Sequence, residues 1–342
     1  MNQQKQLYLL AKKLYKEKLW NDYLKTDLIA IQLANRKEPI IISVLGQTDQ
    51  NYGFLFYRNL EELACFFEAA IREKQQNSRT MPDVIHLQSG LSLEFKDRGA
   101  ISEEEYRLTK DSGVSFRGKK SWPIFVDYFP GYLPSTTDES DNTLLIEVME
   151  KLVETAKDFK KKLAIYKEKK QLSEILIRTY QENDIYTDSL FKLPKNVMKG
   201  TSQFKKMAPI LLTSFEMKRV SSQKIGSSIW EIDIDFMNSP VVSIQGERPF
   251  FPLALLIVDS EESEIICSEF FKPGDSETIQ RLMIQLILSE NKKPPKIVVN
   301  TGQYYRVARY LENLLINLEI ELVPIQKLPM LSAFKKGLLD YL

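Results

Sequence analysis

An alternation of apolar strands and amphipathic helices over residues 230–325 constrains the fold more than any other feature of this chain. Short apolar runs bounded by polar turns predict strands at 230–236, 253–258, 264–271, 296–299 and 320–325. Apolar residues at helical spacing predict helices at 276–289, 303–317 and 331–341. Three strands followed by alternating helices and strands indicate an α/β domain with a mixed sheet and helices on its faces.

The N-terminal half predicts an α+β domain. Three short strands at 28–33, 39–45 and 52–57 are separated by turn residues, which indicates an antiparallel meander. Further strands are predicted at 84–87 and 91–95, and helices at 5–19, 60–74, from Ser102 to about Gly113, and from 144 to about 170, with helical character continuing to Tyr180. The prolines and glycines of 116–123 and 129–134 predict ordered loops. We therefore expect domains at 1–175 and 226–342, joined by a linker at 176–225.

Composition excludes several classes of protein. The 47 basic residues nearly balance the 46 acidic ones, so the net charge of +1 gives no sign of a strongly basic face for nucleic acid. The sequence predicts a cytoplasmic protein with no membrane partner, because it shows no signal peptide and no apolar run near the roughly 20 residues that span a bilayer.

Cysteine and histidine are too scarce for most catalytic or metal sites. Cys65 and Cys267 lie far apart in apolar contexts, which predicts buried free thiols and excludes a cysteine-based zinc site. His86 is the only histidine, so any serine or cysteine triad would depend on it. No motif surrounds His86, which favours a structural or surface histidine over a catalytic one.

Acids at predicted strand ends are the candidate catalytic residues. Asp233 and Asp235 end the first strand of the C-terminal domain, and Asp259 begins a turn after the second. Carboxylates at such positions could hold two magnesium ions for phosphoryl chemistry. No nucleotide-binding glycine motif is present, and no cofactor other than that magnesium is expected.

The order of elements over residues 229–325, together with Asp233 and Asp235, is similar to ribonuclease-H-like and retroviral-type integrase cores. This resemblance implies a second acid just after the fourth strand, where this chain has Asn300. It also implies a third acid on a helix after the fifth strand, where residues 329–342 carry only Asp340. The chain thus matches the predicted fold better than the chemistry for which that fold is known.

Candidate binding residues are Trp122, Tyr132 and Arg117, in the aromatic loops of the N-terminal half. The alternative is that these aromatics fill a core, with Trp122 largely buried against the helix near residues 145–152. The lysine runs 160–162 and 167–170, and Arg306 or Arg309, could contact nucleic acid, although a solvated helix face is the more ordinary interpretation of such runs.

A set of aromatic, glycine and proline motifs runs through both halves. The motifs are Trp20, 42–46, Tyr52-Gly53, Phe56-Tyr57-Arg58, 116–118, Trp122-Pro123, 130–132, 230–233, 256–259 and Pro294-Pro295. In these residues the chain resembles a group of bacterial proteins built from a pair of domains of unknown function. That family has no established activity, so the leading hypothesis is a non-catalytic protein that binds a protein or nucleic-acid partner. The alternative is a metal-dependent nuclease or nucleic-acid-binding protein that uses the strand-end acids.

Overall fold

A computed structural model describes residues 2–46, 51–75, 86–168, 173–200, 207–242 and 247–340. The chain divides into two compact units. The first contains the described residues up to 200, apart from His86 and Gly131–Leu133, which group with the second. No helix among the described residues combines the length and the apolar character needed to cross a membrane.

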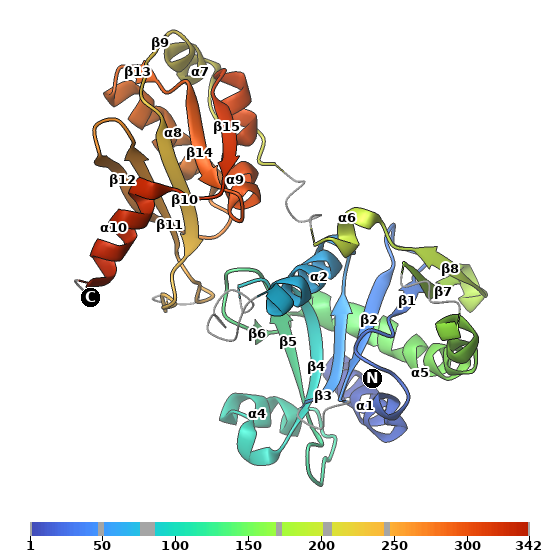
Figure 1. The fold of residues 1–342 in the computed structure, drawn as a ribbon. Helices are drawn as coiled ribbons and strands as arrows, with labels where there is room; N and C mark the ends of the chain where they lie inside the picture. The colour runs from blue at the N-terminus through green and yellow to red at the C-terminus, as the bar shows by residue number, and fades with distance from the viewer. Residues whose placement is uncertain are drawn as a thin grey trace. The chain divides into compact units, whose positions relative to one another are not determined.

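The first unit is built on a single eight-stranded sheet, with strand order β6-β5-β4-β3-β2-β1-β7-β8 (Figure 1). Its strands are β1 (Ile29–Gln32), β2 (Ile40–Leu45), β3 (Tyr52–Tyr57), β4 (Gly90–Lys96), β5 (Trp122–Tyr128), β6 (Ser135–Thr136), β7 (Glu174–Tyr180) and β8 (Tyr186–Lys192). Its α-helices are α1 (Gln3–Glu17), α2 (Leu60–Gln75), α4 (Glu103–Asp111), α5 (Glu139–Glu168) and α6 (Lys195–Met198), and its 3-10 turns are η1 (Leu19–Asn21), η2 (Arg98–Ala100) and η3 (Glu182–Asp184). The predicted antiparallel meander of β1, β2 and β3 is confirmed, and only β1 and β7 pair in parallel.

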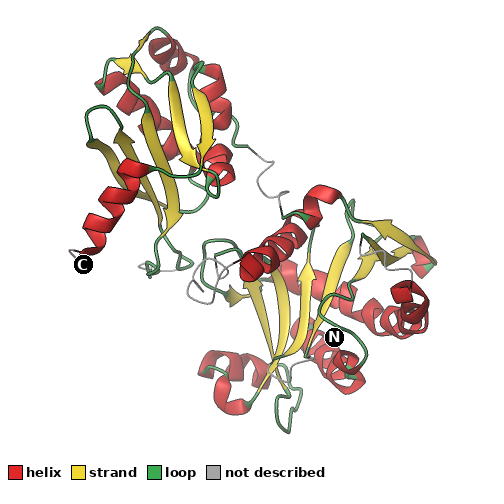
Figure 2. Cartoon of the chain, in the orientation of Figure 1, coloured by secondary structure: helices red, strands yellow, loops and turns green. Residues whose placement is uncertain are grey.

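Helices cover both faces of this sheet (Figure 2). Leu14 of α1 and Leu152 of α5 share one core with Ile42, whereas Leu63 of α2 shares the opposite core with Ile41. Successive strand residues point to opposite faces, so β2 needs apolar residues at nearly every position. The short helix α4 covers the outer end of the sheet beside β5.

The second unit contains a five-stranded mixed sheet of order β12-β11-β10-β14-β15. Its strands are β10 (Trp230–Phe236), β11 (Leu253–Asp259), β12 (Glu264–Phe271), β14 (Lys296–Asn300) and β15 (Glu321–Ile325), and a separate two-stranded sheet holds β9 (Lys224–Ile225) and β13 (Lys292–Lys293). Its helices are α7 (Ser214–Ser221), α8 (Ser276–Ser289), α9 (Tyr304–Asn317) and α10 (Pro329–Asp340). α8 and α9 cover one face and α10 the other, so the predicted mixed α/β sheet is confirmed.

Three predictions about the N-terminal half are wrong. The helical character expected up to Tyr180 is instead strand β7, and β8 follows it, so residues 176–192 belong to the sheet and not to a linker. Trp122-Pro123 begins β5 although a loop is predicted there. β6 pairs only with Val126 and Asp127, so β5 has a single neighbouring strand at Pro123, where a missing N–H group is tolerated. His86 and Leu87 form a turn in place of a strand, and residues 84 and 85 lie outside the described residues.

Candidate functional site

The strand-end acids of the second unit do not converge. Asp233 pairs with Leu256, which faces α10, whereas Asp259 pairs with Trp230, which faces α8 and α9. Directly paired residues share a face of the sheet, so Asp233 and Asp259 point to opposite faces and lie about 10 Å apart along the strands. Among the described residues, no group of three or more Asp, Glu, His and Cys side chains is arranged to hold a metal ion.

Asp259 and Asp235 each have an evident structural role. Asp259 accepts hydrogen bonds from the backbone N–H groups of Glu261 and Glu262, at 2.9 and 3.1 Å. Burial alone would raise the pKa of Asp259, but hydrogen bonds outweigh it and lower the pKa. Asp235 forms an ion pair with Arg306 and accepts a hydrogen bond from Gln303 at 3.2 Å. The arrangement therefore gives no support to a two-metal site built from Asp233, Asp235 and Asp259.

Asn300 stabilises the turn that follows β14. Its Nδ2 donates to the carbonyl oxygen of Gln326 at 2.8 Å, and its Oδ1 accepts from the backbone N–H of Gly302 at 2.9 Å. The neutral amide can thus donate and accept within one turn, which a carboxylate could not do.

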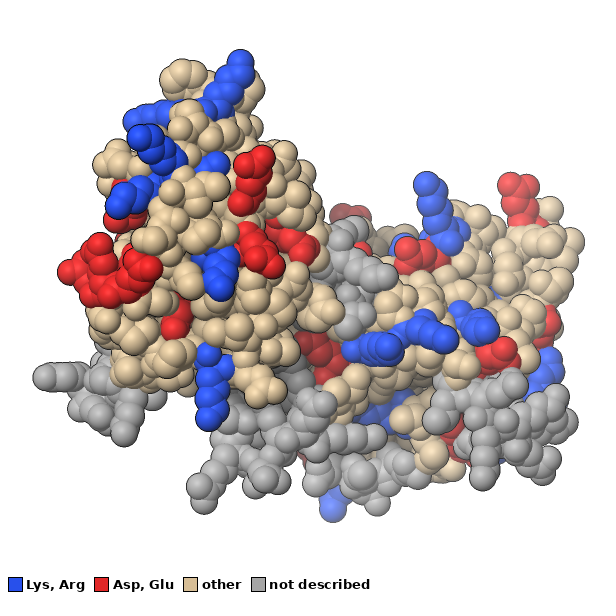
Figure 3. Space-filling view, turned by 45° about the horizontal axis from the view of Figure 1, so that its top comes forward, with Lys and Arg blue, Asp and Glu red and all other residues tan. Residues whose placement is uncertain are grey.

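The candidate nucleic-acid contacts are largely neutralised within the chain. Lys160, Lys161 and Lys162 form ion pairs with the acids Asp22, Asp158 and Asp188. Arg306 forms an ion pair with Asp235, and Arg309 is half-buried. The side chains of the second lysine run, 167–170, lie outside the described residues. On the face shown in Figure 3 both signs of charge occur and uncharged residues cover most of the surface.

His86 is a buried structural residue. Its side chain is 4% exposed, and its ring lies 4.6 Å from that of Phe236 and 4.5 Å from that of Phe251, measured between centroids. The structural interpretation is thus favoured over the surface one.

The predicted binding residues do not form one surface patch. Arg117 is exposed in the first unit, whereas Tyr132 groups with the second, where its ring lies 6.0 Å from that of Phe250. Trp122 is half-buried, and its nearest ring neighbours are Tyr106 of α4 at 5.5 Å and Phe116 at 6.4 Å. Trp122 is less buried than expected, and its ring packs both against the cluster on the α4 side of the sheet and against the larger core, to which Leu145 and Leu152 of α5 belong.

A smaller stability effect than for a fully buried tryptophan is therefore expected of Trp122→Ala. We expect a loss of about 2 kcal/mol in the free energy of unfolding, below the 3–5 kcal/mol typical of fully buried aromatics. Urea unfolding measures it, with Ile185→Ala as a control because Ile185 is 61% exposed in the same unit. A loss equal to that of the control would contradict the packing role of Trp122.

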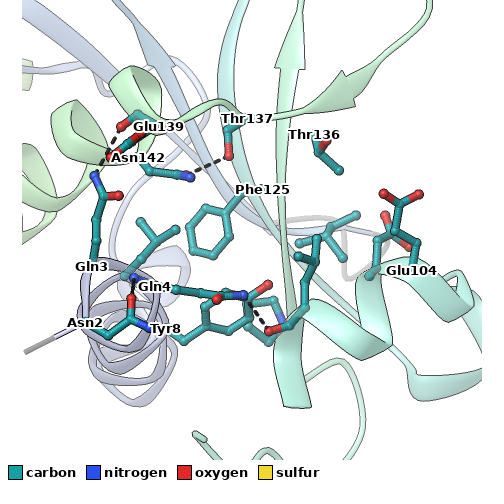
Figure 4. Close-up of a pocket in the computed structure, with 15 residues that line it drawn as sticks. Asn2, Gln3, Gln4, Tyr8, Glu104, Phe125, Thr136, Thr137, Glu139 and Asn142 are labelled. Atoms are coloured by element: carbon teal, nitrogen blue, oxygen red, sulfur yellow. Dashed lines mark hydrogen bonds between the residues drawn. The ribbon is translucent and has the colours of Figure 1, made fainter. Parts of the chain in front are cut away.

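A cavity of about 390 Å³ lies in the first unit, between the start of α1, α4, β5 and the start of α5 (Figure 4). This volume falls in the range of small-molecule sites. Its apolar floor includes Tyr8 and Phe125, which are 5% and 7% exposed and meet edge to face at 5.4 Å. Burial raises the pKa of the Tyr8 hydroxyl, so it stays protonated.

Amides, hydroxyls and acids form the rim of the cavity. The lining polar residues are Asn2, Gln3, Gln4, Glu104, Glu105, Thr136, Thr137, Glu139 and Asn142. Several are held in place by hydrogen bonds. Gln3 Nε2 donates to the carbonyl oxygen of Glu139 at 3.1 Å, and Thr137 Oγ1 donates to Asn142 Oδ1 at 2.8 Å. Glu105 completes a capping box with Ser102 at the start of α4.

A partly buried arginine anchors the same end of the sheet. Arg58, directly after β3, contacts Glu62 at 2.7 Å, Asp127 at 3.1 Å and Asp141 at 3.0 Å. Asp141 precedes the cavity residue Asn142 on α5, so this cluster fixes the start of the helix that forms one wall.

Sequence reasoning missed the cavity. Its lining residues come from four separate segments of the sequence, and Gln3 and Gln4 look like the solvated face of a helix. No local pattern marks them.

Comparisons with known proteins identify families but no activity. Domain of unknown function (DUF7309) matches residues 5–178, and Domain of unknown function (DUF6930) matches residues 216–339, which confirms the predicted pair of uncharacterised domains. No curated protein matches the chain.

Two solved structures show weak similarity. The crystal structure of the Mos1 strand transfer complex is 16% identical, with 38% of this chain and 50% of that chain covered and a TM-score of 0.18. The crystal structure of a pre-cleavage Mos1 transpososome is 14% identical, with 79% of each chain covered and a TM-score of 0.17. The chain spans half the length of the first of these, and TM-scores this low inform neither fold nor function.

Proposed function

The chain belongs to the DUF7309 family, whose description assigns no activity, and we propose from the geometry that it is a non-catalytic binding protein. Its N-terminal unit would hold a small polar molecule. The observation that carries this proposal is the cavity of about 390 Å³, with an apolar floor and a rim of positioned polar groups. That combination is typical of small-molecule sites, where the apolar floor supplies affinity and a few polar groups supply specificity.

The second unit supports a binding role in a different way. We infer a ribonuclease-H-like arrangement, supported by a central β10 that pairs antiparallel with β11 and parallel with β14. Asp235 and Asp259 are engaged in holding neighbouring groups, so this unit is proposed to act as a scaffold. Bacterial origin and a cytoplasmic location stay predictions from the sequence.

Blocking the cavity tests the proposal. Thr136 is exposed on the rim, so Thr136→Trp is expected to fill the entrance without disturbing the core. Thr187→Trp is the matched control, because Thr187 is an exposed threonine on edge strand β8 outside the cavity lining.

Thermal melts against a panel of small amines, polyols and dicarboxylates give the readout. A ligand at ten times its Kd stabilises the folded state by about 1.4 kcal/mol, which raises the melting midpoint by a few degrees. We expect one class to raise the midpoint of the wild type and of Thr187→Trp, but not of Thr136→Trp. An equal response of all three proteins, or no response of the wild type to any class, would overturn the proposal.

A further inference from the structure

The charged side chains at the cavity rim are all acidic. Glu104, Glu105 and Glu139 line it, and no lysine or arginine is among its lining residues, all of which belong to the described part of the chain. The N-termini of α1, α4 and α5 also lie here, and each contributes about half a positive charge. Three carboxylates exceed that total of roughly +1.5, so the cavity has net negative potential and disfavours phosphates and carboxylates.

The hydrogen-bonding groups left over for a ligand are mainly acceptors. Gln3 Nε2 donates to a backbone carbonyl oxygen of Glu139, and Gln4 Nε2 donates to that of Leu108 at 2.9 Å. Carbonyl oxygens can only accept, which fixes both amide orientations and leaves the Oε1 atoms as acceptors. Together with the carboxylates of Glu104 and Glu139, these atoms suit a ligand that brings several N–H donors.

The position of the acids adds a second constraint. Figure 4 shows Glu139 and Glu104 on opposite sides of the cavity, with the ring of Phe125 between them. An apolar linker fits against Phe125 and Tyr8, whose ring faces also attract cations.

We propose that this cavity binds a small aliphatic diamine, with one ammonium group near Glu139, the other near Glu104, and the methylene linker over the aromatic floor. The inference rests on the proposed function and specifies its ligand class. It requires no chemical step, since both nitrogens of an aliphatic diamine are protonated at neutral pH.

Calorimetric titration with three four-carbon probes tests the charge argument. The probes are 1,4-diaminobutane, 1,4-butanediol and succinate, which have the same chain length and differ in charge. We expect saturable binding of the diamine that weakens as salt is added, diol binding at least tenfold weaker, and no binding of succinate. The full-length protein should carry its tag at the C-terminus, because Asn2 lines the cavity.

Glutamine variants then locate the site. Glu104→Gln and Glu139→Gln should each weaken diamine binding about two- to fivefold, the range of exposed ion pairs. Glu103→Gln is the matched control, because Glu103 is exposed in the same first turn of α4, pairs with Arg98 and does not line the cavity. It should leave the affinity unchanged.

The outcomes separate this inference from the proposed function. If 1,4-butanediol binds as tightly as the diamine, the inference fails while the cavity remains a binding site. If the diamine binds but Glu103→Gln weakens it as much as Glu104→Gln does, the assigned site is wrong. Absence of diamine binding overturns the inference, and the panel with Thr136→Trp judges the proposed function independently.

Discussion

Arg58→Met is expected to destabilise the first unit by about 3 kcal/mol, the lower end of the cost of removing one partner from a buried ion cluster, because this cluster is only partly buried. The side chain of Arg58 is 22% exposed, and those of Glu62, Asp127 and Asp141 are 10–14% exposed. Its Nε, Nη1 and Nη2 atoms each face a different carboxylate. Arg58→Lys should therefore recover only part of the loss, because a single ammonium nitrogen cannot contact three carboxylates as the three guanidinium nitrogens do.

The pH dependence of this loss has a definite sign. Burial raises the pKa of Glu62 and of Asp141 despite the opposing charge of Arg58. A raised carboxyl pKa contributes stability that is present below the unfolded pKa, near 4, and is lost as pH rises through the folded pKa. Without Arg58 both pKa values move further up, so the loss caused by Arg58→Met should be larger at pH 8 than at pH 5.

Urea unfolding at the two pH values measures the effect. Arg107→Met is the control, since Arg107 is exposed and forms no ion pair with any described residue, and it should change stability by less than about 0.5 kcal/mol. A loss that is the same at both pH values, or greater at pH 5, would show that the cluster is not governed by buried carboxylates.

The elements of the second unit could be predicted from the sequence because each is marked locally. Its strands are short apolar runs bounded by turns, as at 253–258. α8 has the N-cap Asp275 directly before an apolar stripe. Even the mixed pairing follows from the order of elements, since a helix between two strands normally makes them parallel.

The error at β7 shows where local signals are insufficient. Ile175, Ile177 and Thr179 are β-branched and alternate, which favours a strand. However, the strand is buried on both faces: Ile177 lies in the core under α2 and Tyr180 in the core under α5. That burial hides the polar–apolar alternation, and the partner strand β1 lies far away in the sequence.

The cavity and the Arg58 cluster needed the structure for the same reason. Only Glu62, four residues after Arg58, could be paired with it from the sequence. Asp127 and Asp141 reach Arg58 because β3 and β5 terminate at the same end of the sheet and α5 begins there. Sequence reasoning looked instead for acids after the strands of the second unit, where the pairing register separates Asp233 from Asp259.

A second arginine is expected to show a pH dependence in the same direction but in a more acidic window. Arg178 of β7 is 1% exposed and forms ion pairs with Asp188 of β8 at 2.8 Å and with Asp158 of α5 at 2.9 Å. The ring of Tyr186 lies 3.8 Å from its guanidinium carbon. Arg178→Met should cost about 3 kcal/mol, the lower end for a broken buried pair, because Asp158 is 35% exposed and can be solvated.

Hydrogen bonds from Arg178 lower the pKa of both Asp188 and Asp158. A lowered carboxyl pKa contributes stability that is present above the unfolded pKa, near 4, and is lost as pH falls through the folded pKa. The loss caused by Arg178→Met should therefore be full at pH 7 and shrink as the pH falls below about 4, whereas the loss caused by Arg58→Met still increases between pH 5 and pH 8. Urea titrations at pH 3 and pH 7 measure the loss in the free energy of unfolding. Arg98→Met is the control. Because the Arg98–Glu103 ion pair is exposed, it should contribute less than about 1 kcal/mol at either pH. A loss that persists undiminished at pH 3 would mean that Arg178 stabilises the sheet through packing against Tyr186 and not through its carboxylates.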